Sequence, residues 1–549
     1  MKQKYNPMLM QGAILAIAGI FTKIIGFFYR IPMANLLGEE GNGIYSVSFG
    51  IYNVALTLSS YSFPLAVSKL VSTRLAKKER KNAQHVFSTV LLFSIIVGIC
   101  SFSLLFFGAE ALESLYKTNG LAYPLKVLAP TTFIVSVLGV FRGYFQGHSN
   151  MIPTALSQIF EQIVNALVSI LATFIAIKTF SGDAQIWAKG AAGATMGTLA
   201  GAVCALTFII LTFIRRMPYT KELMLSDTSL EENKTSIMRD LIITMIPLIL
   251  SQTVYQISFT VDDLLFSNTL FSKGINQSEI SALQGVFNTQ YTQLINIPIS
   301  ISTAMSASAL PAIINLSVKK DFKERKEKIK TFFKINMIIT VPCAIGLTVF
   351  ASPLIKLIFP SLITWRSVAT NLLYFGSFGC VFYSLSTVTT SVLQGCNKMR
   401  IPVVNSFISF VLHTAVVFLL LKYTSLGIWA RLIGDMTFPL CIAALNLIQL
   451  KRKTGFTLPI KKIFLYPTLA SIIMGVGALA IYLLINALLK SYVVSLFVSV
   501  IFAVALYVVL ILIFPVFEDD EFSQLPKGHK IKALSNKLKK QFKTRVTTI

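Results

Sequence analysis

The stretch FQGHSNMIP at residues 145–153 recurs in the second half of the chain as LQGCNKMRIP at residues 393–402. The two stretches align Gln146 with Gln394, at an offset of 248 residues. A glutamine–glycine pair followed by a proline is common loop chemistry, so this match alone does not establish a repeat. A repeat requires further matches at nearly the same offset and in the same order.

Two more landmarks meet that requirement. YSFPLAVSKLVS at 61–72 matches SASALPAIINLS at 306–317, where the shared proline gives an offset of 247, and the basic loop 74–81 matches 320–328. We therefore infer an internal duplication of six-span halves that both begin on the same side of the membrane. Parallel repeats of this kind are typical of alternating-access transporters, which bind their substrate between the halves near the membrane midplane.

The composition indicates an integral membrane protein. Of 549 residues, 54% are hydrophobic and 13% are charged, and the mean hydropathy is +0.70, whereas soluble domains carry about 25% charged residues. Continuous apolar stretches of about 20 residues recur along the chain, and each can cross a bilayer as a helix. The sequence predicts an all-α integral membrane protein with about fourteen transmembrane helices, at 11–35, 44–72, 85–107, 122–146, 153–178, 187–214, 239–266, 284–316, 331–351, 366–394, 402–422, 427–450, 463–489 and 492–515.

The predicted spans and loops divide the chain into five regions. The repeats form an N-lobe (1–215) and a C-lobe (239–450), joined by a polar cytoplasmic linker (216–238). Two further spans in 451–516 fall outside the repeat and need a separate role, and a basic tail follows at 517–549. We expect the first apolar segment to be an uncleaved span, because no small-residue cleavage site follows it.

The net charge of +26 is distributed unevenly over the loops. The loops 36–43 and 268–283 carry at most one lysine or arginine, whereas many are concentrated at 73–84, 317–334, 451–462 and after residue 516. This is the positive-inside pattern, which places both termini and the basic loops in the cytoplasm. Such a distribution argues against nucleic-acid binding.

The residue types that build catalytic or metal sites are scattered. The six cysteines include no CxxC pair and the four histidines are dispersed, so we expect neither a disulfide framework nor a zinc site. We expect no enzyme activity, no catalytic residue, no metal site and no cofactor.

The first span contains FTKIIGFFYRIP at 21–32, with two cations in apolar surroundings. Lys23 and Arg30 are seven residues apart, so two helical turns place them on one face. A charge at the bilayer centre costs at least about 2.5 kcal/mol, which favours a position facing an internal cavity. Snorkelling to the interface is the alternative, and it suits Arg30 better than Lys23. Lys69, near the inner end of the second span, is a third candidate and lies within reach of the interface.

Carboxylates in the expected spans are candidates for ion coupling or for charge compensation. Asp262 and Asp263 lie in the seventh span, the counterpart of the first. They could coordinate a coupling cation or receive a proton, or one of them could neutralise a first-span cation when no substrate is bound. Glu161 in the fifth span is a further charge partner, although a helix-to-helix hydrogen bond is the simpler interpretation. The sequence leaves these alternatives open.

A cationic pocket in a helical transporter predicts an anionic substrate such as a phosphate or a pyrophosphate. Arginine binds phosphate through two parallel hydrogen bonds, and lysine binds it as a point charge. Export of two negative charges from a negative interior gains roughly 4–5 kcal/mol per 100 mV when both cross the full potential. The membrane potential could therefore drive transport, and coupling to Na+ or H+ through the aspartates is the alternative.

TKIIGFFYRIPMANLLGEEGNGIYS at 22–46, followed by FPLAVSKLVS at 63–72, resembles the start of the stage V sporulation protein B group. That group belongs to the polysaccharide-lipid flippase branch of the MATE-like (MOP) superfamily, alongside the MurJ-type lipid II flippases. The similarity extends, at the level of pattern, to the fourteen spans, the basic loop after the second span and the QG loops after the fourth and tenth.

The resemblance implies two six-helix lobes around a central cavity, with the last two spans forming a groove for a polyprenyl tail. It implies a flippase that moves an undecaprenyl-(pyro)phosphate-linked sugar from the inner to the outer leaflet, either lipid II or a related cell-wall or polysaccharide precursor. The implied substrate-binding cations are Lys23, Arg30 and Lys69. Gln293 in the eighth span occupies a substrate-facing position where Gram-negative MurJ-type proteins have an arginine. This difference weakens the case for lipid II itself.

The resemblance makes the chain a bacterial plasma-membrane protein, expected as a monomer, whose partners are an anionic lipid-linked oligosaccharide and membrane lipids. A MATE-type multidrug/cation antiporter is the alternative within the superfamily, although such exporters usually have twelve spans and an acidic site. A membrane glycosyltransferase or polymerase is a third class, and it would be expected to carry acidic catalytic residues on a large outer loop. A sporulation-specific role and a housekeeping role are not distinguished.

Overall fold

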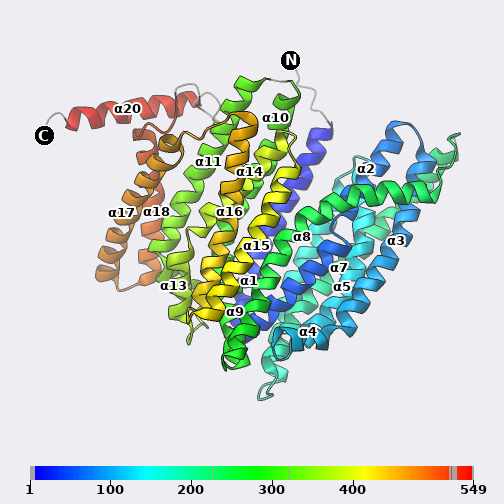
Figure 1. Cartoon of the computed structure of the whole chain (residues 1–549), viewed down its shortest axis with the longest axis horizontal. Helices are drawn as coiled ribbons and strands as arrows, with labels where there is room; N and C mark the ends of the chain where they lie inside the picture. Colours follow the sequence, from blue (N-terminus) through cyan, green and yellow to red (C-terminus); the bar gives the residue numbers. More distant parts are fainter. Residues whose placement is uncertain (1–6, 226, 320, 519–520, 522–527, 547–549) are drawn as a thin grey trace. The chain divides into compact units, whose positions relative to one another are not determined.

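The computed structural model describes residues 7–225, 227–319, 321–518, 521 and 528–546. Within these ranges the regular secondary structure is helical (Figure 1), which confirms the predicted all-α fold class. The chain forms two compact units, residues 1–289 and 290–549.

The first unit contains α1 (Pro7–Ser59), α2 (Phe63–Ala76), α3 (Arg80–Phe107), α4 (Ala109–Tyr116), α5 (Ala122–Gly147), α6 (Ile152–Thr179), α7 (Ile186–Leu225), α8 (Lys234–Ser272) and α9 (Gln277–Gly285). A π-helical turn, η1 (Val286–Tyr291), spans the boundary between the units. The second unit contains α10 (Thr292–Val318), α11 (Phe322–Val349), α12 (Ala351–Ile358), α13 (Arg366–Gly376), α14 (Gly379–Gly395), α15 (Arg400–Tyr423), α16 (Ile428–Thr454), the π-helical turn η2 (Lys461–Leu465), α17 (Tyr466–Leu489), α18 (Tyr492–Ile513) and α20 (Gly528–Val546).

Eleven segments of the described chain are long and apolar enough to cross a membrane, or twelve when the bent pair α13 and α14 counts as one span. This identifies a multi-pass membrane protein. Every expected span overlaps a helix of the structure, but the expected number of fourteen is not confirmed. The difference arises because the first two expected spans are counted together in one segment, residues 17–76, and because α8 is not among the eleven.

The first two expected spans are joined by a kink instead of the expected outer loop at 36–43. α1 runs through this stretch, where only Gly38 leaves helical geometry, with φ of 66° and ψ of −167°. Glycine adopts a positive φ without steric cost, so the chain changes direction at Gly38 between two helical segments of α1. The second expected span then breaks near Ser62, and Pro64 opens α2 at a position where its missing N–H is not needed.

The internal duplication is visible in the backbone of the two QG loops. Ser149 and Asn397 both have a left-handed conformation, with φ of 56° and 59°. Their N–H groups donate to the carbonyl oxygens of Gln146 and Gln394, at 2.9 Å in each loop. A positive φ is uncommon outside glycine. Its recurrence at equivalent positions therefore supports the duplication inferred from the sequence.

The helices around these loops pack in equivalent pairs within the two units. In the first unit α5 packs against α2, α3 and α7, and in the second α14 packs against α10, α11 and α16. The next helices also pair, α6 with α7 and α15 with α16. However, α8 packs on α1 to α4 and belongs to the first unit. The expected lobes follow the internal repeat, whereas the two observed units follow spatial compactness. The lobe boundaries expected at 215 and 239 therefore stay a prediction.

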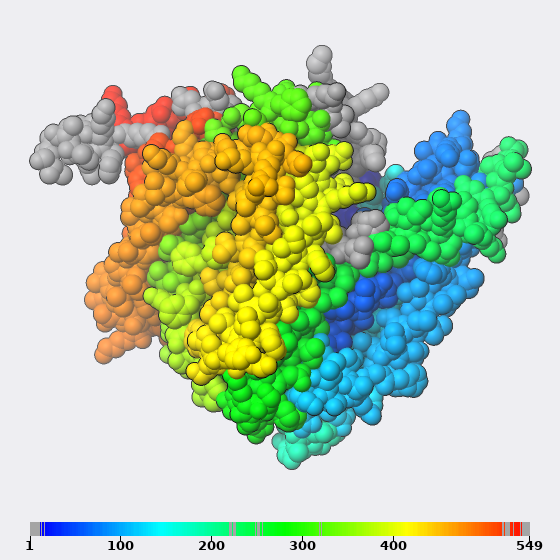
Figure 2. Space-filling model, in the orientation of Figure 1, coloured from blue at the N-terminus to red at the C-terminus, as the bar shows by residue number. Residues whose placement is uncertain are grey.

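Apolar side chains cover much of the surface formed by α17 and α18. The α17 part of this surface lies at the left of the view in Figure 2. Leu488 and Ile501 are 72% and 71% exposed. Exposed apolar faces of this extent are unusual for a water-soluble protein, whereas the hydrocarbon of a bilayer covers them without cost. The two C-terminal spans therefore present lipid-facing surfaces.

Gly43 of α1 and Gly285 of α9 allow these two helices to approach closely. A Cβ atom added to Gly43 would lie 1.7 Å from the carbonyl oxygen of Ser281, and one added to Gly285 would lie 2.7 Å from the nitrogen of Gly43. A side chain at either position would force the backbones apart. Small residues at such crossings are the usual way for membrane helices to gain van der Waals contact.

We expect Gly43→Ala to lower the thermal unfolding temperature of the detergent-solubilised protein, because the added methyl group overpacks the α1–α9 crossing by about 1–3 kcal/mol. The matched control is Gly19→Ala on the same helix, where an added Cβ meets nothing within 4 Å. Equal unfolding temperatures for the two variants would contradict the close crossing.

Candidate anion-binding site

The two cations of the first span lie on α1, within the membrane-spanning segment. Both side chains are exposed. The guanidinium carbon of Arg30 is 5.7 Å from the centre of the Phe49 ring, close enough for a cation–π contact. Within the described part of the chain, neither Lys23 nor Arg30 forms an ion pair with a carboxylate. No acidic side chain among the described residues therefore pairs directly with either cation.

A polar face of α6 lies along the same stretch of α1. A Cβ atom added to Gly26, which lies between the two cations, would be 3.3 Å from the side-chain nitrogen of Gln162. One turn further on, the Asn165 amide donates to the hydroxyl of Tyr29 at 3.4 Å. The surroundings of the cation pair are therefore polar on the side that α6 covers.

An ion pair that the sequence analysis missed lies in the same unit. Arg142 of α5 donates to a carboxylate oxygen of Glu161 on α6 at 2.6 Å, and its Nε donates to the Ser157 hydroxyl at 3.0 Å. The sequence did contain an indication of this pair, because Arg142 is a charged residue within the apolar stretch of the fourth expected span. What the sequence did not reveal is that the QG loop turns α6 back, so that residues 19 positions apart meet.

This ion pair gives Glu161 a defined partner. The glutamate joins two helices, in agreement with the helix-to-helix interpretation, although through an ion pair and not between neutral groups. Tyr52 lies within electrostatic reach of Glu161, and its ring is 5.5 Å from that of Phe49, the ring that contacts Arg30. Aromatic contacts therefore link Arg30, through the Phe49 ring, to Tyr52.

The two aspartates of α8 are buried. One carboxylate oxygen of Asp263 accepts hydrogen bonds from the amides of Asn288 at 3.0 Å and Gln284 at 3.4 Å. No ion pair joins Asp262 or Asp263 to Lys23 or Arg30 in the described chain. Both hypotheses for these aspartates, cation or proton coupling and compensation of the first-span cations, stay predictions.

The remaining candidates lie in two different units. Lys69 is exposed on α2, and its carbonyl oxygen accepts from the hydroxyls of Ser72 and Thr73 at 3.0 and 2.8 Å. Gln293 is buried on α10 in the second unit. Six of the seven predicted site residues therefore belong to the first unit, and a shared role with Gln293 stays a prediction.

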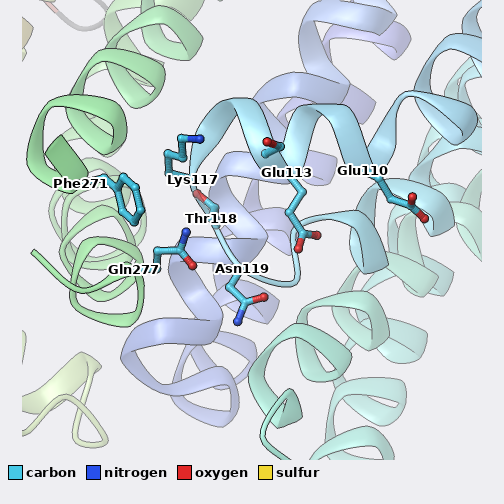
Figure 3. A pocket seen from close by; sticks show the side chains of 8 residues that line it. Glu110, Glu113, Lys117, Thr118, Asn119, Phe271 and Gln277 are labelled. Carbon is cyan, nitrogen blue, oxygen red and sulfur yellow. The ribbon is translucent and has the colours of Figure 1, made fainter. Parts of the chain in front are cut away.

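A cavity of about 280 Å³ lies at the turn after α4, lined in part by Glu113, Lys117 and Phe271 (Figure 3). The charged side chains that line it already interact with neighbouring groups of the protein. Both carboxylate oxygens of Glu113 accept from backbone N–H groups, those of Gly120 at 3.1 Å and Ala122 at 2.8 Å. The ammonium of Lys117 lies 5.7 Å from the centre of the Phe271 ring. We therefore assign this cavity no role in anion binding.

The Arg142–Glu161 pair leads to a double-mutant prediction. Arg142→Gln leaves a carboxylate in apolar surroundings, so we expect it to destabilise the protein more than the double variant Arg142→Gln/Glu161→Gln does. The expected coupling in a chemical-unfolding series in detergent is about 0.5–3 kcal/mol. The control pair is Lys126–Glu110, at 2.8 Å on the exposed surface of the same unit, for which we expect no measurable coupling. Equal coupling in the two cycles would contradict a structural role for Arg142.

Comparison with known proteins identifies the family. The chain matches the family model described as "Polysaccharide biosynthesis protein" over residues 9–317, and a second model, "MatE", over residues 247–419. Stage V sporulation protein B of Bacillus subtilis (strain 168) is 24% identical over 523 residues, which cover 93% of this chain and 96% of that protein. Lipid II flippase MurJ of the same organism is 24% identical over 486 residues, which cover 85% and 87%.

Solved structures share the fold. The inward closed conformation of lipid II flippase MurJ aligns with a TM-score of 0.66 and 16% identity, over 91% of this chain and 98% of that one. An inward-facing multidrug resistance MATE family transporter of the MOP superfamily aligns with a TM-score of 0.64 and 16% identity, over 79% and 94%. With a family model that covers more than half of its length, the chain belongs to the polysaccharide biosynthesis protein family, and it has the fold of the MOP superfamily transporters.

Proposed function

We propose that this protein is an alternating-access flippase that moves an undecaprenyl-(pyro)phosphate-linked sugar from the inner to the outer leaflet of the bacterial plasma membrane. The substrate is lipid II or a related cell-wall or polysaccharide precursor. The observation that carries the proposal is the pair Lys23 and Arg30, which lies in a membrane-spanning segment without a carboxylate partner in the described chain.

The physical argument rests on the cost of those charges. An uncompensated cation in the membrane is expensive, so a bound anion stabilises the site by more than it would in water. A pyrophosphate matches the pair in charge, because it carries at least two negative charges. The planar guanidinium of Arg30 can bind two of its oxygens at once, while the ammonium of Lys23, about two turns away, adds a point charge. The polar face of α6 supplies amides at the same level of α1.

The similarity to proteins that carry the names Stage V sporulation protein B and Lipid II flippase MurJ supports this class of function, since the alignments cover most of each protein. By the same analogy we propose a monomer with both termini in the cytoplasm, with no resident cofactor and no catalytic step. The membrane potential can drive export of the anionic head group. Coupling to Na+ or H+ through Asp262 or Asp263 is the competing energy source.

A MATE-type multidrug/cation antiporter is the second candidate. It is favoured by the match of residues 247–419 to the MatE model. The charge of the first span argues against it, because Lys23 and Arg30 would repel the cationic substrate of such an exporter. The two candidates thus differ in the sign of the transported charge.

The proposal is tested by a leaflet-accessibility assay for lipid II in cells depleted of their native flippases and complemented with this protein. We expect wild type to restore outer-leaflet lipid II, and Lys23→Ala and Arg30→Ala each to reduce the rate roughly 10- to 100-fold, as expected for loss of a hydrogen bond to a charged group. The matched control is Lys178→Ala, an exposed cation in the last turn of α6, which should retain the wild-type rate at equal membrane abundance.

Each outcome has a distinct meaning. Full activity of Lys23→Ala and Arg30→Ala would remove these residues from the substrate site. Failure of wild type to restore lipid II would exclude that substrate, and the same assay with other undecaprenyl-linked glycans would follow. Drug efflux by wild type in place of lipid flipping would overturn the proposal in favour of the antiporter.

A further inference from the structure

The C-terminal helix α20 lies across the end of α18, in the second unit (Figure 1). The buried hydroxyl of Ser535 on α20 donates to the carbonyl oxygen of Leu512 at 2.7 Å. Leu512 belongs to the last turn of α18, a 22-residue apolar helix that can cross the membrane. This hydrogen bond places the middle of α20 at the end of this apolar helix.

Two acidic residues that follow α18, Glu518 and Glu521, form ion pairs with neighbouring elements. Glu521 is buried and accepts from the ammonium of Lys334 on α11 at 2.6 Å, and Lys334 is itself fully buried. Glu518 accepts from Lys330 of α11 and Lys462 of η2, both at 2.7 Å. These two ammonium groups lower the pKa of Glu518 to about 2, so the carboxylate is ionised throughout the physiological pH range. Glu518 and Glu521, which follow α18, are therefore held beside α11 and η2.

The composition of this segment suits a membrane surface. Residues 522–549 contain eight lysine and arginine residues and no aspartate or glutamate. On the helix, the side chains of Lys530, Lys537 and Lys540 are exposed. Leu534 is 49% exposed, and Leu538, four residues later, lies on the same face. An exposed leucine on a strongly basic helix is typical of helices that lie in the interface of a bilayer, with lysines toward the head groups and apolar side chains toward the acyl chains.

We propose that α20 is a bilayer-surface helix that binds the head groups of anionic phospholipids beside the last membrane span. Every charged residue of the helix is basic, so the helix complements an anionic surface and would be repelled by a cationic one. Attraction to an anionic leaflet is worth about a fivefold change in binding for each lysine near the surface. The Ser535–Leu512 hydrogen bond holds the helix at the end of the last span. The inference does not depend on which substrate the protein transports.

The experiment is hydrogen–deuterium exchange of the full-length protein in nanodiscs of phosphatidylcholine, with or without one-third phosphatidylglycerol. We expect the backbone amides of α20 to exchange at least about tenfold more slowly in the anionic nanodiscs, and high salt to abolish the difference. The triple variant Lys530→Gln/Lys537→Gln/Lys540→Gln should lose most of the difference. The three lysines lie on α20, outside the spans, so we expect their replacement to leave the fold of the spans intact.

A matched control removes the same charge elsewhere in the second unit. The variant Lys451→Gln/Arg452→Gln/Lys453→Gln alters three exposed cations at the end of α16 and should leave the lipid-dependent protection of α20 unchanged. Equal exchange of α20 in neutral and anionic nanodiscs, or equal effects of the two triple variants, would overturn the proposal. Protection of α20 by added single-stranded RNA but not by anionic lipid would overturn it in favour of a nucleic-acid-binding tail.

Discussion

The hydrocarbon interior of a membrane offers no hydrogen-bonding partner, and this constraint governs both the backbone and the charges of the protein. Each backbone N–H and C=O group must be satisfied within its own helix, so the chain continues as helix wherever it can. α1 illustrates the result, since only Gly38, with a positive φ, leaves helical geometry between the two helical segments of α1. Where helices meet, Gly43 and Gly285 let two backbones approach, because van der Waals contact replaces the hydrophobic effect as the source of packing energy.

The same constraint divides the charged residues into two classes. Most of those with defined partners serve the structure: Arg142 with Glu161 joins α5 to α6, and Lys334 with Glu521 joins α11 to the segment before α20. Lys23 and Arg30 differ, because they carry charge in a membrane-spanning segment without an acidic partner in the described chain. The contrast between these classes is a stronger argument for an anion site than the presence of the cations alone.

Several features could be predicted from the sequence because they depend on local chemistry. The helical fold followed from continuous apolar stretches. The duplication followed from the QG loops, where Ser149 and Asn397 now prove to share one backbone conformation and one hydrogen-bonding pattern. The span count was less predictable, because the kink at Gly38 and the break near Ser62 depend on how single residues are accommodated in long helices. Lys23, Arg30 and Lys69 could be selected because charged residues are rare in spans, and Arg142 was overlooked although it satisfies the same criterion.

The sequence by itself determined that this protein is an all-helical, duplicated membrane protein with cations in its first span. Such properties are set by composition, periodicity and the cost of charge in hydrocarbon. Only the tertiary structure decided which charges have partners, because an ion pair such as Arg142–Glu161 requires two helices to pack in one register. It also decided where the basic tail lies, since the hydrogen bond from Ser535 to Leu512 and the buried ion pair at Glu521 join segments whose contact no local pattern encodes. Composition and periodicity specify the helices, and the packing of distant helices specifies which of their charged side chains form ion pairs.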